Sequence, residues 1–264
     1  MNAAVTVSNP APPMREDLRL AGLLGLASAL ATAALFPYLQ LLMPEALAKV
    51  PLPLPLLILV QCGQAALLLG LLAFCGLRMG HALGIGAPWL RALLARAPRT
   101  RQPWLLALAC GSVAAFVVVG LDPLFAAHMP APLHALPAAS SETHAVAGFL
   151  ASFYGGIAEE IQLRLFFVTL LAWGLSRFSA GRVAGWQLAL AVVLAAIAFG
   201  AGHLPAAAQL WPLDTVVVAR TLLLNGIAGL VFGWFYVRHG LESAMLSHFC
   251  ADLVLHVAAP LMMA

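Results

Sequence analysis

Two adjacent carboxylates and a guanidinium stand inside an apolar stretch of this sequence. Glu159 and Glu160 are followed by Arg164, and most of their neighbours are apolar. A charge near the centre of a bilayer costs about 2.5–3.5 kcal/mol on insertion scales, so such groups are expected to be paired or functional. On an α-helix Glu160 and Arg164 share one face and can pair, whereas Glu159 points about 100° away. The spacing therefore predicts a supporting Glu160 and a Glu159 that is free to act as a base.

Three more polar residues lie in apolar segments further along the chain. His203 ends one such segment, and His248 and Asp252 are four residues apart in another, so these two share a helix face. In one mechanism, Glu159 and His203 hold a water molecule, and one of them abstracts its proton for attack on a carbonyl. His248 and Asp252 then donate hydrogen bonds to the developing oxyanion. Asp252 can do so only if it is protonated or acts through His248.

A second mechanism uses a metal ion. Glu159, His203 and His248 are residue types that bind a divalent metal such as zinc, which would generate the attacking hydroxide. Side-chain types alone do not separate the two mechanisms. The sequence holds neither HExxH nor GxSxG, so it predicts neither an ordinary zincin nor a serine nucleophile elbow. Of the other histidines, His256 is expected to face away from the site.

The elements that position these residues are predicted to be membrane helices. The chain has 264 residues, of which 63% are hydrophobic and only 9% are charged, well beyond a soluble domain. Because about 20 apolar residues span a bilayer, we predict an all-α, polytopic bundle of about seven transmembrane helices. The expected spans are 20–42, 56–77, 104–125, 144–173, 186–203, 216–237 and 241–262, with a loop at 204–213.

The expected organisation has three parts. Residues 1–19 form a disordered cytoplasmic tail, residues 20–140 form N-terminal transmembrane helices without a motif, and residues 141–262 form the catalytic helical core. Gly155 and Gly156 are expected to bend or start a helix just before the acids. Asn225, Gly229 and Gly233 recur every four residues and predict a face for close helix packing.

The distribution of basic residues predicts the orientation. With seven spans, nearly all arginines outside the spans fall on the side of the N-terminus, and Lys49 falls on the other. Because lysine and arginine favour the cytoplasmic side, we expect an integral protein of a bacterial cytoplasmic membrane with a cytoplasmic N-terminus. The net charge of +3 comes from few, separated basic residues, so no nucleic-acid partner is expected.

The motifs together resemble those of a known family. Glu159-Glu160-x-x-x-Arg164, Phe199-x-x-x-His203 and His248-x-x-x-Asp252, in this order, are similar to the CPBP family of intramembrane proteases, also called the CAAX-protease and bacteriocin-processing, or Abi, family. The segment from 225 to 240 is also similar to the stretch before the family's last motif. The resemblance covers roughly residues 145–257. Two positions depart from the pattern: Asp252 stands where asparagine is common, and Leu165 where glycine is frequent.

The resemblance implies an intramembrane endopeptidase that hydrolyses a peptide bond. Its substrate would be a membrane-associated or prenylated, lipid-anchored peptide or protein, met within the lipid bilayer. By position, Glu159 and His203 would activate water, His248 and Asp252 would serve the oxyanion, and Glu160 and Arg164 would be supporting. The alternative is an inactive family member that acts as a bacteriocin-immunity, regulatory or scaffold protein. A transporter with a proton-relay carboxylate ranks lowest, because the chain supplies few polar side chains for a route through the bundle.

Overall fold

The chain folds as a bundle of helices. The computed structural model describes residues 13–133, 139–179 and 182–262. In chain order the helices are α1 (Met14–Leu42), α2 (Pro44–Ala48), α3 (Leu54–His81), α4 (Pro88–Leu94), α5 (Trp104–Leu121), α6 (Pro123–Ala126), α7 (Ser141–Phe153), η1 (Tyr154–Glu159), η2 (Ile161–Val168), α8 (Thr169–Ser176), η3 (Arg177–Ser179), α9 (Gly185–Gly202), α10 (Leu204–Leu210), α11 (Thr215–His239), α12 (Leu241–Asp252), η4 (Leu253–Ala258) and α13 (Ala259–Met262). Within these ranges no strand occurs.

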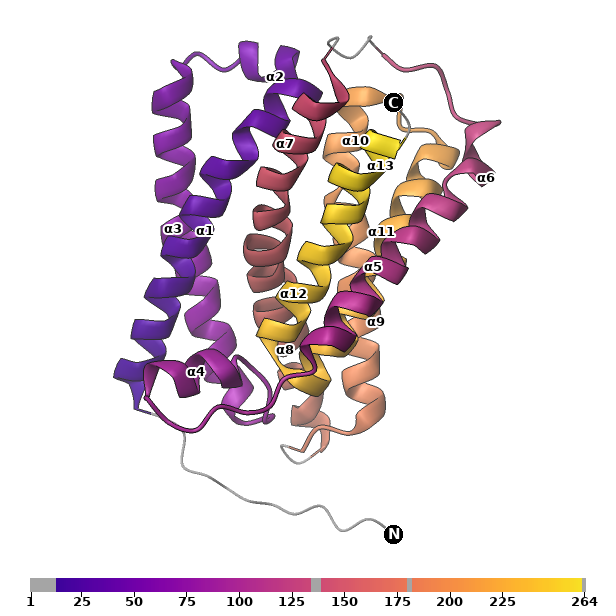
Figure 1. The fold of residues 1–264 in the computed structure, drawn as a ribbon. Coiled ribbons are helices and arrows are strands. Elements are labelled where there is room, and N and C mark those ends of the chain that lie inside the picture. The colour runs from indigo at the N-terminus through magenta and orange to yellow at the C-terminus, as the bar shows by residue number, and fades with distance from the viewer. Residues whose placement is uncertain (1–12, 134–138, 180–181, 263–264) are drawn as a thin grey trace.

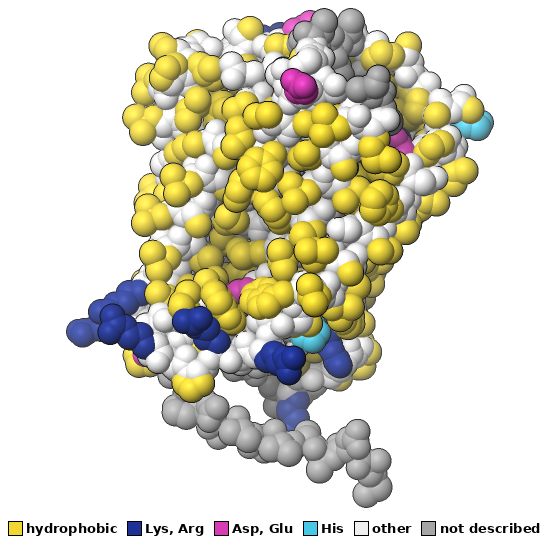
Figure 2. Space-filling model, in the orientation of Figure 1, with side chains coloured by type: hydrophobic (Ala, Val, Ile, Leu, Met, Phe, Trp, Pro, Cys, Tyr) yellow, Lys and Arg dark blue, Asp and Glu magenta, His cyan; other side chains and the backbone are white. Residues whose placement is uncertain are grey.

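Seven helical stretches of the described chain are long and apolar enough to cross a membrane. They run 14–42, 54–81, 104–126, 141–179, 185–210, 215–239 and 241–262. Short helices cap the bundle, with α4 at one end and α2 and α10 at the other (Figure 1). Large apolar side chains such as Leu30, Leu67 and Leu105 are exposed on the sides, and the apolar surface continues along the bundle (Figure 2). The predicted all-α, polytopic membrane bundle is therefore confirmed.

The span that carries the two acids is one long helix with an unusual centre. It starts at Ser141, where the Ser140 side chain accepts a hydrogen bond from the backbone N–H of Thr143 and so caps the helix. From Tyr154 to Glu159 and from Ile161 to Val168 the backbone is π-helical. The expectation that a helix starts at Gly155 and Gly156 is wrong, because the helix continues from α7 through both glycines. Wide π-helical turns within α-helices are frequent at functional sites.

Helices α9 and α11 pack closely through the glycines that the sequence analysis identified. A Cβ on Gly229 would lie 3.1 Å from the Cα of Ala196, and one on Gly233 would lie 2.6 Å from Cγ1 of Val192. A side chain at either position would force the two helices apart. The predicted packing face is confirmed, and its partner is α9.

Two boundaries differ from the sequence-based expectation. α1 begins at Met14, so residues 14–19, expected in the disordered tail, belong to a helix. Its first turn carries Glu16 and Asp17, and acidic residues are favoured at a helix N-terminus. Residues 1–12 lie outside the described chain. The expected loop at 204–213 is largely the short helix α10. Pro205 occupies its first turn, where a missing N–H costs no hydrogen bond.

Candidate active site

A cavity of about 480 Å³ lies among α1, η1, α9, α11 and α12. Four predicted site residues line it, namely Glu159, His203, His248 and Asp252. Most of its wall is apolar, and the described residues that line it include neither lysine nor arginine. Three separate helices thus bring the predicted residues to one hollow inside the bundle.

The supporting pair forms as the spacing predicts. Arg164 Nη1 lies 3.0 Å from Glu160 Oε1, and both side chains are buried. Arg164 Nη2 also donates to the Gly229 carbonyl at 3.2 Å. The guanidinium lies 4.8 Å from the ring centre of Phe199 and 5.3 Å from that of Phe232, distances at which aromatic rings attract a cation. Arg164 is therefore held by groups on three helices, and its contact with Glu160 holds that carboxylate in place.

Glu160 has a second partner that the sequence did not predict. His248 Nδ1 lies 2.8 Å from Glu160 Oε1. This carboxylate oxygen, which also faces Arg164, accepts the hydrogen bond. Nδ1 is therefore the protonated nitrogen that donates it. The His248 ring also stacks on Phe232, with ring centres 4.3 Å apart. Both contacts fix the ring and direct Nε2 away from Glu160. No local spacing could reveal this bond, because its two residues lie on different spans.

Nε2 of His248 lies between two other carboxylates. It is 3.7 Å from Glu159 Oε2 and 3.6 Å from Asp252 Oδ1. Both distances exceed an ordinary hydrogen bond. The nitrogen is therefore held close to both oxygens without a direct bond to either, and it remains available to a third group in the cavity.

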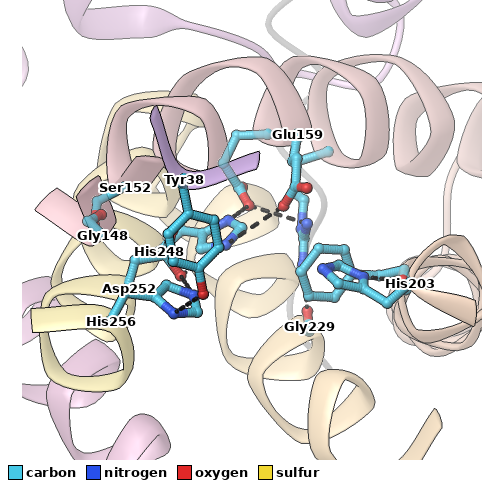
Figure 3. Close-up of polar contacts among 12 residues, drawn as sticks. Tyr38, Gly148, Ser152, Glu159, His203, Gly229, His248, Asp252 and His256 are labelled. Carbon is cyan, nitrogen blue, oxygen red and sulfur yellow. Dashed lines mark hydrogen bonds and ion pairs between the residues drawn. The ribbon is translucent and has the colours of Figure 1, made fainter. Parts of the chain in front are cut away.

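Glu159 differs from Glu160 in its surroundings, as predicted. Its side chain is 21% exposed, whereas that of Glu160 is fully buried. Across the described ranges no lysine or arginine forms an ion pair with Glu159. Figure 3 shows Glu159 projecting toward the space between His248 and His203. Its carboxylate is thus open to the cavity and can accept a proton there.

His203 presents one nitrogen to the cavity. It follows the last residue of α9, and its Nδ1 lies 2.8 Å from the Phe199 carbonyl oxygen. A carbonyl only accepts, so Nδ1 is the protonated nitrogen and Nε2 carries the lone pair in the neutral ring. The side chain lines the cavity (Figure 3). His203 can therefore accept a hydrogen bond from a water or hold a cation.

Gly155 makes room for the carboxylate of Asp252. A Cβ at Gly155 would lie 2.1 Å from Asp252 Oδ2 and 3.0 Å from His248 Nε2. The glycine is thus required by a close approach between helices η1 and α12. In the sequence, the only indication of this close approach was that Gly155 lies four residues before Glu159; the structure shows that this spacing corresponds to one π-helical turn.

Two site residues were missed. His256 was expected to face away, and this is wrong: it lines the cavity, with Nε2 4.0 Å from Asp252 Oδ1. Tyr38 of α1 also lines it, and its hydroxyl lies 3.0 Å from His256 Nδ1. The spacing of four residues between Asp252 and His256 could have revealed His256. Tyr38 gave no signal, because it comes from a span without a motif.

The residues do not form a compact metal site. In the part of the chain that the structure describes, no group of three or more His, Cys, Asp or Glu side chains is arranged to hold a metal ion. Glu159, His203 and His248 share the cavity, but they do not converge on one point as metal ligands do.

Comparison with known proteins places this region in a family. Residues 141–254 match the model of the Rce1-like family, described as type II CAAX prenyl endopeptidase Rce1-like. No curated protein and no solved structure gave a match. The matched residues include all seven named positions of the three motifs, and the family indicates a peptide hydrolase of the membrane. Residues 141–254 of this chain are therefore similar to the Rce1-like CAAX prenyl endopeptidases, and this match agrees with the CPBP-type family that the motifs predicted.

Proposed function

We propose that this protein is an intramembrane endopeptidase that cleaves a peptide bond with a water activated by Glu159 and His203. One observation carries the proposal. Of two adjacent glutamates in one helix, Glu160 is buried and paired with Arg164, while Glu159 is open to a cavity shared with three histidines and Asp252. A bundle stabilised by its polar residues alone would have no need to keep Glu159 unpaired beside a hollow.

In the proposed reaction, the water lies between the Glu159 carboxylate and His203 Nε2. Glu159 takes one proton as the water oxygen bonds to the carbonyl carbon of the substrate. The carbonyl oxygen becomes an oxyanion. It accepts hydrogen bonds from His248 when that ring is an imidazolium, with Nδ1–H bonded to Glu160 and Nε2–H directed at the oxyanion, and from Asp252 when it is protonated. Glu159 then returns its proton to the amide nitrogen, and the C–N bond breaks to give a carboxylic acid and an amine. Glu160, Arg164 and Phe232 hold the ring of His248 throughout.

The test uses purified protein in liposomes with a library of membrane-associated peptides, and products are identified by mass spectrometry. Glu159→Gln and His203→Ala are expected to abolish cleavage while the melting temperature stays near that of the wild type. Glu142→Gln, an exposed glutamate in the same long helix, is the matched control and should cleave normally. Cleavage by Glu159→Gln at the wild-type rate would contradict the mechanism.

A metal measurement separates the two chemistries. Under the proposal, activity survives incubation with a chelator, and the purified active protein carries no stoichiometric metal. If chelation abolishes cleavage and zinc restores it, Glu159, His203 and His248 act as metal ligands instead. If no substrate is cut and biological activity follows only the amount of folded protein, the immunity, regulatory or scaffold alternative holds.

A further inference from the structure

The two ends of the bundle differ in charge. One end, here called the arginine-rich face, holds the start of α1, the end of α3, all of α4, the start of α5, the end of α8 and the end of α11 (Figure 1). The segments at this end carry ten arginines: Arg15, Arg19, Arg78, Arg91, Arg96, Arg99, Arg101, Arg177, Arg182 and Arg238. The opposite end has Lys49, and Arg220 near it is paired with Asp122 at 2.6 Å. The dark blue side chains gather at the lower end of the molecule in Figure 2, where α4 lies in Figure 1. The molecule therefore has a strong positive bias toward one side of the membrane.

The active-site cavity extends toward the opposite end. α1 starts at the arginine-rich face, and the part of it that lines the cavity is its last two turns, from Leu35 to Leu42, together with Met43. α9 also starts at that face, and Phe199 and Gly202 near its far end line the cavity. His203, just after α9, and Ala206 of α10 continue this lining. With a rise of about 1.5 Å per residue, His256 lies roughly 20 Å along its span from the arginine-rich face. The helices α1, α9 and the last span therefore line the cavity with residues from their middle or from the end that lies away from the arginine-rich face.

A layer of buried side chains closes the cavity on the other side. Along α11, Phe232 lines the active-site cavity, Phe235 is buried, and Tyr236 already borders a different cavity. Along η2 and α8, Leu165, Val168 and Thr169 are likewise buried. The Thr169 and Tyr236 hydroxyls are hydrogen-bonded at 2.5 Å. The fully buried side chains Leu77, Leu165, Val168, Phe235 and Leu241 complete this layer.

The cavity beyond this layer belongs to the arginine-rich face. Its volume is about 560 Å³, and its lining includes Arg91, Arg101 and Arg238 but none of the proposed catalytic residues. The two hollows therefore open at different ends of the bundle. A peptide that enters from the arginine-rich face meets the buried layer before it can reach Glu159.

We propose that the active site opens to the side of the membrane opposite the arginine-rich face, and that its substrate is a peptide segment presented from the non-cytoplasmic side. Lysine and arginine concentrate on the cytoplasmic side of membrane proteins, so the far end faces outward. The substrate class rests on the proposed function; the direction of opening does not. An apolar wall that lacks lysine and arginine suits an apolar stretch, such as an exported peptide or the outer end of a membrane segment.

The direction of opening is tested by cysteine labelling. In a background with Cys62, Cys75, Cys110 and Cys250 replaced by alanine, single cysteines are placed at Ala206, which lines the cavity, and at Ala97, which is exposed on the arginine-rich side. Right-side-out and inverted vesicles of a bacterial host are treated with a membrane-impermeant maleimide. Ala206→Cys should be labelled in right-side-out vesicles, and Ala97→Cys in inverted vesicles. The reverse pattern overturns the proposal.

The substrate class is tested on the same vesicles with peptides of the library added outside. Cleavage is expected in right-side-out vesicles and should be lost in the Glu159→Gln variant. Cleavage confined to inverted vesicles would overturn the proposal while supporting the peptidase. Absence of cleavage in both, with the expected labelling, would overturn the substrate class together with the proposed function and leave the direction of opening supported.

Discussion

His248 Nδ1 lies 2.8 Å from Glu160 Oε1, and this bond ties the last motif to the first. The same oxygen lies 3.0 Å from Arg164 Nη1. One carboxylate oxygen thus anchors both a buried guanidinium and the imidazole that faces the cavity. Glu160 therefore both positions His248 in the site and contributes to the stability of the bundle. Glu159 takes part in neither of these two contacts.

The two glutamates should consequently differ in their effect on stability. Glu160→Ala leaves Arg164 buried without its counter-charge, and loss of one partner of a buried ion pair costs about 3–5 kcal/mol. Glu159→Ala removes a partly exposed group whose ionisable neighbour, His248 Nε2, lies 3.7 Å away, beyond hydrogen-bond distance, and it should cost less than about 1 kcal/mol. Denaturant unfolding in detergent measures both. Equal losses would show that the asymmetry between the two acids is not energetic.

Gly155 should be intolerant of any side chain. In Gly155→Ala the new Cβ would lie 2.1 Å from Asp252 Oδ2, so the carboxylate must move and cleavage should fall sharply. Gly174→Ala, in the same long helix with no atom within 4 Å of the added Cβ, is the matched control. It should keep full activity and a stability equal to or up to about 1 kcal/mol above wild type, because alanine favours a helix. Normal cleavage by Gly155→Ala would show that Asp252 need not stay in place.

Asp252→Asn tests the oxyanion role of that residue. An aspartate donates a hydrogen bond only in its protonated form, whereas an asparagine amide donates at every pH. The variant should therefore stay active, and its kcat/KM relative to wild type should rise as the pH rises. A pH profile of both proteins measures this ratio. An inactive Asp252→Asn variant, folded as judged by its melting temperature, would show that the site needs a carboxylate there.

Tyr38 and His256 are expected to act as one unit that positions Asp252. The Tyr38 hydroxyl lies 3.0 Å from His256 Nδ1, and His256 Nε2 lies 4.0 Å from Asp252 Oδ1. Tyr38→Phe and His256→Leu should each lower kcat, and the double variant should lose no more than the worse single variant. A double-mutant cycle measures this coupling. Additive losses would mean that the two residues act independently.

The sequence by itself determined the helices and the local pair. Long apolar segments must form membrane helices, because backbone groups in lipid have to be hydrogen-bonded within the segment. The Glu160–Arg164 pair follows from a spacing of four residues, and it survives in the π-helical backbone. The same local argument separated Glu159 from Glu160, and the order of the motifs predicted the family.

Only the tertiary structure decided which residues meet. Tyr38 reaches His256 across 218 positions of the chain, and His248 reaches Glu160 across 88. Such contacts depend on how the helices pack, which no spacing within one helix contains. The end of the bundle at which the cavity lies was likewise decided by packing, because it depends on where the buried layer around Phe235 closes the interior. Local periodicity specifies a helix and its faces, whereas the partner of each face is set by the fit of all seven spans.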